Sequence, residues 1–130
     1  MKKIKAISLL ASLVLLLSAC SSYTSTSTFN GSRTGNKDQF IMDYLILNTT
    51  DYQLLELEEG DIVDFDIVSK SGKVNVSLQK EGEEPVYEGN DVETSSFKVT
   101  IGESGTYKAT VTGKKAKGSV SIIKEGNSNE

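Results

Sequence analysis

The chain has 130 residues, of which 14 are basic and 18 acidic, for a net charge of −4. It contains no histidine and no tryptophan, and Cys20 is its single cysteine. These counts exclude zinc and copper sites built on His and Cys and Ser-His-Asp or Cys-His catalysis. The acidic balance argues against a nucleic-acid partner. We therefore expect no enzymatic activity and no cofactor.

The first 20 residues predict a bacterial lipoprotein signal. Three lysines within residues 1–5 precede an apolar stretch, residues 6–17, which is shorter than the roughly 20 residues of a transmembrane helix. Ser18 and Ala19 then lead into Cys20, an order that resembles a secretory signal ending in a lipobox. The resemblance implies that Cys20 is acylated and anchors the mature chain to the extracytoplasmic face of a cell membrane. The alternative is an uncleaved signal anchor.

Composition divides the chain into four segments. Residues 1–19 are expected as a helical signal peptide, 20–36 as a flexible lipid-anchored tether, 37–126 as a β-sandwich domain and 127–130 as a disordered tail. The tether reads SSYTSTSTFNGSRTGN after the cysteine, a Ser/Thr/Gly/Asn-rich composition typical of linkers, although the first strand could begin at Phe29. Removing the signal leaves 11 basic and 18 acidic residues, a net charge of −7.

Apolar alternation predicts about eight short strands, at residues 40–47, 52–57, 63–67, 74–78, 86–88, 97–101, 107–111 and 120–122. Turn signals separate them, including residues 58–61, 69–72, 89–91 and 113–118. This spacing favours a single all-β domain, an antiparallel, jelly-roll-like β-sandwich. Alternation places these side chains inward: Leu55, Leu57, Val63, Phe65, Ile67, Val74, Val76, Leu78, Phe97, Val99, Ile101, Tyr107, Ala109, Val111, Val120 and Ile122.

The run from Gly60 to Ile123 carries a resemblance. It contains Gly-Asp before a strand, then Ser-Gly-Lys-Val, Val-Tyr-Glu-Gly, Phe-Lys-Val-Thr-Ile and Gly-Thr-Tyr-Lys-Ala-Thr-Val-Thr-Gly. This plan resembles small Firmicutes lipoproteins with one jelly-roll-like sandwich, and is similar in layout to bacterial pre-peptidase C-terminal and GOLD-type domains. Pre-peptidase domains commonly show Asp-hydrophobic-Asp-Leu where this chain has Asn75-Val76-Ser77-Leu78, so a calcium or ligand role tied to that aspartate does not carry over to this chain.

Three aspartates are weak candidates for a metal site. Asp64 and Asp66 lie two residues apart and share one face of a strand, and Asp61 precedes them. Clustered oxygens are what Ca²⁺ prefers, but no loop here has the spacing of a calcium motif. The favoured interpretation is a solvated outer face.

Tyr52, Tyr87, Asn90 and Asp91 are the candidate ligand-binding residues. Tyrosine rings on an exposed face can stack on sugars, and Asn90 and Asp91 lie in a turn that could contact a ligand. The alternative is that the turn uses Asn and Asp for backbone reasons. Tyr107 is expected in the core with its hydroxyl at the rim.

Lys114, Lys115 and Lys117 predict a basic hairpin tip on an acidic protein. Such a tip could dock an anionic polymer or a lipid headgroup, or could simply be a soluble turn.

These features favour a lipid-anchored, non-catalytic binding or adaptor module for an envelope protein or glycan. A structural or accessory envelope subunit is the first alternative and a small carboxylate-based hydrolase the last. An exposed aromatic pair such as Tyr52 and Tyr87 on one face would favour a glycan. A long uncharged edge strand would favour a protein partner, and a deep pocket with converging carboxylates would favour an enzyme.

Overall fold

The computed structural model describes residues 27–126, which form seven strands and no helix. Every strand pairing is antiparallel, so the predicted all-β antiparallel sandwich is confirmed. The strands are β1 (Thr28–Asn36), β2 (Gln39–Asn48), β3 (Thr50–Leu57), β4 (Ile62–Lys80), β5 (Pro85–Gly89), β6 (Ser95–Thr100) and β7 (Gly105–Lys124).

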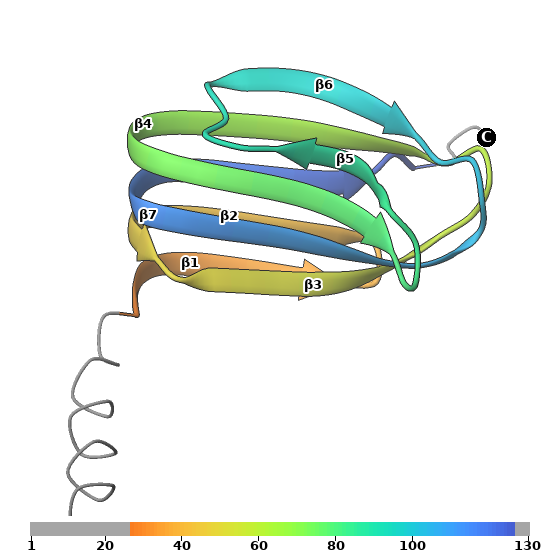
Figure 1. Cartoon of the computed structure of the whole chain (residues 1–130), viewed down its shortest axis with the longest axis horizontal. Helices are drawn as coiled ribbons and strands as arrows, with labels where there is room; N and C mark the ends of the chain where they lie inside the picture. The colour runs from red at the N-terminus through yellow and green to blue at the C-terminus, as the bar shows by residue number, and fades with distance from the viewer. Residues whose placement is uncertain (1–26, 127–130) are drawn as a thin grey trace, which may run out of the picture.

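Two long strands build both layers of the sandwich. β4 and β7 have 19 and 20 residues, and each bends near its middle, so that its two halves belong to different layers (Figure 1). The first sheet contains β1, β2, the second half of β7, the first half of β4, and β6. The second sheet contains β3, the first half of β7, the second half of β4, and β5. The core lies between these sheets.

The chain reverses direction at residues 69–72 and 113–118, as expected, but these segments are bends within β4 and β7 rather than turns between separate strands. They pair with each other, with Ser69 opposite Gly118 and Lys73 opposite Lys114, and the register shifts between those pairs. Positive φ angles at Gly72 (73°) and Lys115 (49°) accompany these bends, and each strand folds back there, so that its two ends lie at the same end of the sandwich (Figure 1). Four predicted short strands are therefore two long ones, and Lys114, Lys115 and Lys117 lie where β7 passes from one sheet to the other rather than at the tip of a hairpin.

The first strand lies where the tether was expected. β1 spans Thr28–Asn36, within residues 20–36, and pairs with β2 along its whole length. Its sequence shows no apolar alternation because nearly all of its side chains are exposed. A Cβ at Gly31 would lie 2.1 Å from the Asp43 carbonyl oxygen, so the irregularity between Asn30 and Gly31 requires glycine. Backbone pairing, rather than core burial, forms this strand.

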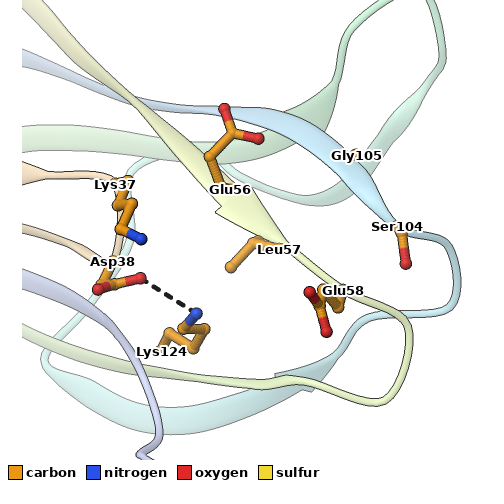
Figure 2. Close-up of a pocket in the computed structure, with 8 residues that line it drawn as sticks. All are labelled: Lys37, Asp38, Glu56, Leu57, Glu58, Ser104, Gly105 and Lys124. Carbon is orange, nitrogen blue, oxygen red and sulfur yellow. Dashed lines mark ion pairs between the residues drawn. The ribbon is translucent and has the colours of Figure 1, made fainter.

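The two ends of the sandwich differ. The end that carries the bends of β4 and β7 is called the bent end, and the opposite end, with the β1–β2 and β3–β4 connections, the open end. At the open end the Lys124 amide donates to the Asp38 carbonyl at 3.0 Å. The side chains of the same two residues form an ion pair at 3.0 Å (Figure 2). These bonds tie the β1–β2 connection to the last residue of β7.

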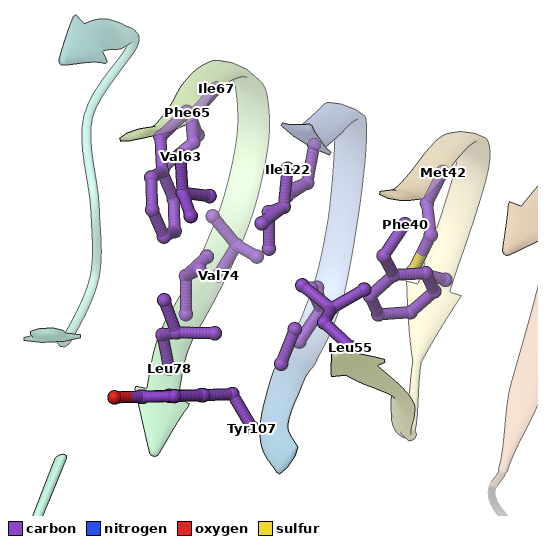
Figure 3. Close-up of a cluster of buried hydrophobic side chains, with 14 of the residues drawn as sticks. Phe40, Met42, Leu55, Val63, Phe65, Ile67, Val74, Leu78, Tyr107 and Ile122 are labelled. Carbon is purple, nitrogen blue, oxygen red and sulfur yellow. The ribbon is translucent and has the colours of Figure 1, made fainter. Parts of the chain in front are cut away.

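The core follows the predicted alternation closely. Figure 3 shows β4 arching over, with Phe65, Val74 and Ile122 inside the space that the strands enclose. Of the predicted inward residues, only Phe97 and Val99 are partly rather than fully buried, because β6 lies at an edge of the first sheet. The buried side chains are Phe40, Met42, Tyr44, Leu47, Leu55, Leu57, Val63, Phe65, Ile67, Val74, Val76, Leu78, Ile101, Tyr107, Ala109, Val111, Ala116, Val120 and Ile122.

Candidate functional site

The outer face of the second sheet carries an exposed aromatic ring. Tyr52 on β3 is 50% exposed. The Lys108 ammonium on β7 lies 4.3 Å from the centroid of its ring, in cation–π contact. Leu54 is 40% exposed and shares this face, because side chains two residues apart on a strand point the same way. The ring and its neighbours therefore form an amphipathic surface.

A row of polar side chains crosses the sheet from Tyr52. Thr110 lies opposite Tyr52, Ser77 opposite Thr110, and Glu88 opposite Ser77, so β3, β7, β4 and β5 contribute one residue each. Strands lie about 4.8 Å apart, so the row is about 14 Å long. It joins an apolar ring at one end to a carboxylate at the other.

A shallow hollow of about 200 Å³ lies beside this row. Within it, hydroxyl, amide and carboxylate groups outnumber apolar side chains. At its edge the Thr112 and Thr50 hydroxyls are 3.0 Å apart. The residues that line it are Asn75, Val76, Ser77, Glu88, Gly89, Asn90, Thr110 and Thr112.

The β5–β6 connection places Asn90 at this hollow. Asp91 has φ 52°, in the left-handed region that Asn and Asp adopt more readily than most residues. Its amide donates to the Asn75 side-chain oxygen at 2.8 Å, which holds the connection against β4. Of the predicted ligand residues, Tyr52 and Asn90 thus share one face of the sheet, while Asp91 shapes the turn beside it.

Tyr87 is not part of this face. It packs inward against the core, with ring centroids 5.2 Å from Phe65 and 4.8 Å from Phe97. Burial raises the pKa of its hydroxyl. The expectation that Tyr52 and Tyr87 could form one exposed aromatic pair is therefore wrong, because β5 turns Tyr87 toward the gap between the sheets, where it covers the core at the β5 and β6 edges.

The three candidate metal-binding aspartates have separate partners. Asp61 accepts a hydrogen bond from the Glu58 amide at 2.8 Å and closes the β3–β4 turn. Asp64 pairs with Lys98 at 2.6 Å, and Asp66 accepts a hydrogen bond from the Ser96 hydroxyl. Within residues 27–126, no three His, Cys, Asp or Glu side chains are grouped as a metal site would need. Asp64 and Asp66 instead line a hollow of about 430 Å³ on the outer face of the first sheet.

The open end carries a pocket with several carboxylates in its lining. A pocket of about 300 Å³ includes Asp38, Glu56 and Glu58 in its lining. Asp38 is held by Lys124, and Figure 2 shows the Glu56 carboxylate directed away from that pair. The Thr106 hydroxyl lies 3.0 Å from Glu56. Two of the three carboxylates in this pocket are therefore bound by neighbouring side chains.

The row of Thr110, Ser77 and Glu88 was missed by the sequence analysis. Each of the three alternates with inward residues and is therefore predicted to lie on the surface. The sequence of one strand does not show which other strands lie beside it. The row forms because β4 and β7 each contribute one half to the second sheet, where they lie between β3 and β5.

Comparison with known proteins identifies no family. No family model matches the chain, and no curated protein matches it. Among solved structures, a periplasmic inhibitor of g-type lysozyme from Aeromonas hydrophila is 14% identical, with a TM-score of 0.46 over 79% of this chain and 91% of that one. A low-affinity xylan-binding module from Roseburia intestinalis is 9% identical, with a TM-score of 0.41 over 75% and 86%. The resemblance to Firmicutes lipoproteins remains an expectation.

Cys20 and the predicted signal lie outside the described residues. Between residues 27 and 126 there is no helix with the length and apolar character needed to cross a membrane.

Proposed function

We propose that the chain is a lipid-anchored, non-catalytic binding module on the extracytoplasmic face of a cell membrane, and that it binds a glycan. The observation that carries the proposal is the outer face of the second sheet, where Tyr52 and Lys108 adjoin a hollow of small polar side chains. Sugars combine apolar ring faces with hydroxyl groups, so they suit a surface with an exposed ring and several hydrogen-bonding groups.

The charge of the face favours an uncharged glycan. Glu88 and Lys108 lie on the same face and carry opposite charges, while the groups between them are hydroxyls and amides. The open shape of the hollow would admit a chain from the side and would contact only part of each sugar. We therefore expect modest affinity.

The test compares two variants at one position. Tyr52→Ala removes the ring, whereas Tyr52→Phe keeps it, and both are titrated with uncharged envelope polysaccharide fragments by calorimetry. Tyr52→Ala is expected to weaken binding at least about tenfold, which corresponds to about 1.4 kcal/mol, and Tyr52→Phe to retain most of it. Ser121→Ala, on the outer face of the first sheet, serves as a control. Equal affinity of all three variants, or no saturable binding by the wild type, would contradict the proposal.

A protein partner is the second candidate, supported by β1. This edge strand is nine residues long and carries one charged residue, Arg33, whose side chain binds Asp51 at 2.8 Å. An edge with so little charge can accept a strand from another protein. A photo-crosslinker at Ser32 that captures a discrete protein in intact envelopes, where one at Ser121 does not, would favour this candidate.

A further inference from the structure

The bent end gathers five lysines from two distant parts of the sequence. Pairing between the bends of β4 and β7 places Ser71 opposite Lys117 and Lys73 opposite Lys114. All five side chains are exposed, and none forms an ion pair with another residue in the 27–126 range. We name this group the lysine corner; its members are Lys70, Lys73, Lys114, Lys115 and Lys117.

The opposite end is acidic, and its basic side chains are largely neutralised. Lys80 pairs with Glu103 at 3.2 Å, and Lys124 pairs with Asp38. The acids at the open end are Asp38, Glu56, Glu58, Glu59, Asp61, Glu81, Glu83, Glu84, Glu103 and Glu125. At the bent end, the acids nearest the five lysines are Asp91 and Glu93 of the β5–β6 connection and Asp43, which lies opposite Ser119. An acidic protein thus has one basic end.

The chain enters the domain at this basic end. Thr28, the first residue of β1, pairs with Asn48, whose side-chain oxygen accepts a hydrogen bond from the Lys115 amide at 3.0 Å. Figure 1 shows β1 beginning at the side of the molecule where β4 and β7 bend. Six residues separate Cys20 from Ser27, so a lipid on Cys20 would lie at most about 25 Å away along the chain.

Exposed apolar side chains accompany the lysines. Leu45 is 65% exposed and lies between Tyr44, which is opposite Gly118, and Leu47, which is opposite Ala116. Phe29 on β1, which lies opposite Leu47 of β2, is 39% exposed. Lysines attract anionic headgroups, and neighbouring apolar groups can enter the interface between headgroups and acyl chains.

We infer that the lysine corner docks the domain onto phosphate-bearing lipids of the membrane that holds Cys20. This orientation of the domain on the membrane rests on the lipid anchor proposed above, whereas the gathering of lysines at one end does not. With the bent end against the bilayer, the strands run away from the membrane and the acidic open end points outward. The outer face of the second sheet, with Tyr52 at its side, then remains accessible.

The test uses the processed chain, purified from membranes and reconstituted into vesicles of phosphatidylcholine alone or with one third phosphatidylglycerol. Hydrogen exchange is followed in residues 69–73 and 113–118, and in residues 58–61 and 81–84 at the open end as an internal control. Slower exchange at the bent end, only in the anionic vesicles and reversed by high salt, is the expected result.

Two matched variants separate charge from structure. Replacing Lys70, Lys73, Lys114 and Lys117 by Gln should lower the equilibrium constant for docking by about 100-fold or more. Each lysine near an anionic surface raises that constant about fivefold. Replacing the same four residues by Arg should preserve it. Equal exchange in both vesicle types, or protection that survives in the Gln variant, would overturn the inference.

Two further arms distinguish the alternatives. Flotation with neutral vesicles reports the lipid on Cys20, so failure of the anchor is seen separately from failure of the lysine corner. Soluble polyphosphate without vesicles tests an anionic polymer. Protection by polyphosphate but not by anionic vesicles would reassign the lysine corner to a polymer and overturn the membrane inference.

Discussion

Tyr44 is a buried tyrosine whose hydroxyl has no hydrogen-bond partner among residues 27–126. Burial, with a smaller contribution from the charge of Asp43, raises the pKa of this hydroxyl to about 12. An unpaired buried hydroxyl also lowers the stability of the fold. Phenylalanine should therefore be tolerated at position 44.

Tyr44→Phe should leave stability at neutral pH unchanged or higher. In the wild type, the unfolded tyrosine loses its proton near pH 10 while the folded one keeps it until about pH 12. Stability is therefore lost as the pH rises through that window, by at most about 1.4 kcal/mol per pH unit. Denaturant titrations from pH 9 to pH 12 should show a shallower decline for Tyr44→Phe. Parallel declines in both proteins would mean that the Tyr44 hydroxyl is solvated.

Phe65 tests the predicted strand register. Its ring is 1% exposed and stacks on Phe97 at 4.8 Å. Phe65→Ala should lower the free energy of unfolding by about 3–5 kcal/mol in a urea titration, because it leaves a cavity in the core. Phe29→Ala, at a 39% exposed side chain, should cost far less. A small loss for Phe65→Ala would show that the alternation of β4 had been assigned to the wrong face.

At the level of elements, the bends of β4 and β7 decide the architecture. Gly118 has φ 146°, and a Cβ there would lie 1.9 Å from the Val68 carbonyl oxygen. The two strands can cross from one sheet to the other only where such close backbone contact is possible. At the β1 edge of the first sheet, the Arg33 guanidinium lies over the Phe40 ring. It also donates hydrogen bonds to Asp51 and to the Tyr52 carbonyl of β3, which connects the two sheets.

Gly118→Ala should destabilise the fold by more than about 2 kcal/mol, since both the close contact and the unfavourable backbone angle act against it. Gly102→Ala is the control, because nothing lies within 4 Å of a Cβ at that position. Thermal melts of the two variants measure the difference. Equal melting temperatures would indicate that the bend tolerates a side chain and is less tightly packed than described.

Alternation predicted the inward residues of these strands but not their continuity. Gly72 and Gly118, flanked by Ser and Lys, are typical turn residues, and the same residue types also permit a bulge in a continuous strand. Whether the two halves on either side of such a reversal pair with each other or enter different sheets depends on the strands that lie beside them. The same reason left the start of the first strand, at Phe29 or beyond residue 36, undecided, because the signal of β1 is its hydrogen bonding to β2 rather than any pattern of its own.

For the whole molecule, the charge asymmetry gives the domain a direction. Lysines at the bent end and carboxylates at the open end would orient the sandwich in the field of an anionic membrane. The lipid proposed on Cys20 would supply the attachment, and the lysine corner would supply the orientation. Sheet faces between the two ends would then remain available to a ligand.

Cys20→Ala tests the attachment. We expect the variant chain to incorporate no labelled palmitate and to keep its signal peptide, since the acylated cysteine is what lipoprotein processing requires. Mass spectrometry and membrane fractionation measure both effects, with Ser21→Ala as the control that should be processed normally. Unchanged acylation and processing of Cys20→Ala would remove the lipoprotein proposal.

The sequence by itself determined the all-β class, the inward residues and the candidate ring Tyr52, because period-two alternation depends only on neighbouring residues. The tertiary structure alone decided that Tyr87 packs against the core, that Ser77, Glu88 and Thr110 form one row, and that lysines more than 40 residues apart share one end. Those relations depend on which strands lie side by side, and pairing between distant strands leaves no local pattern in the chain.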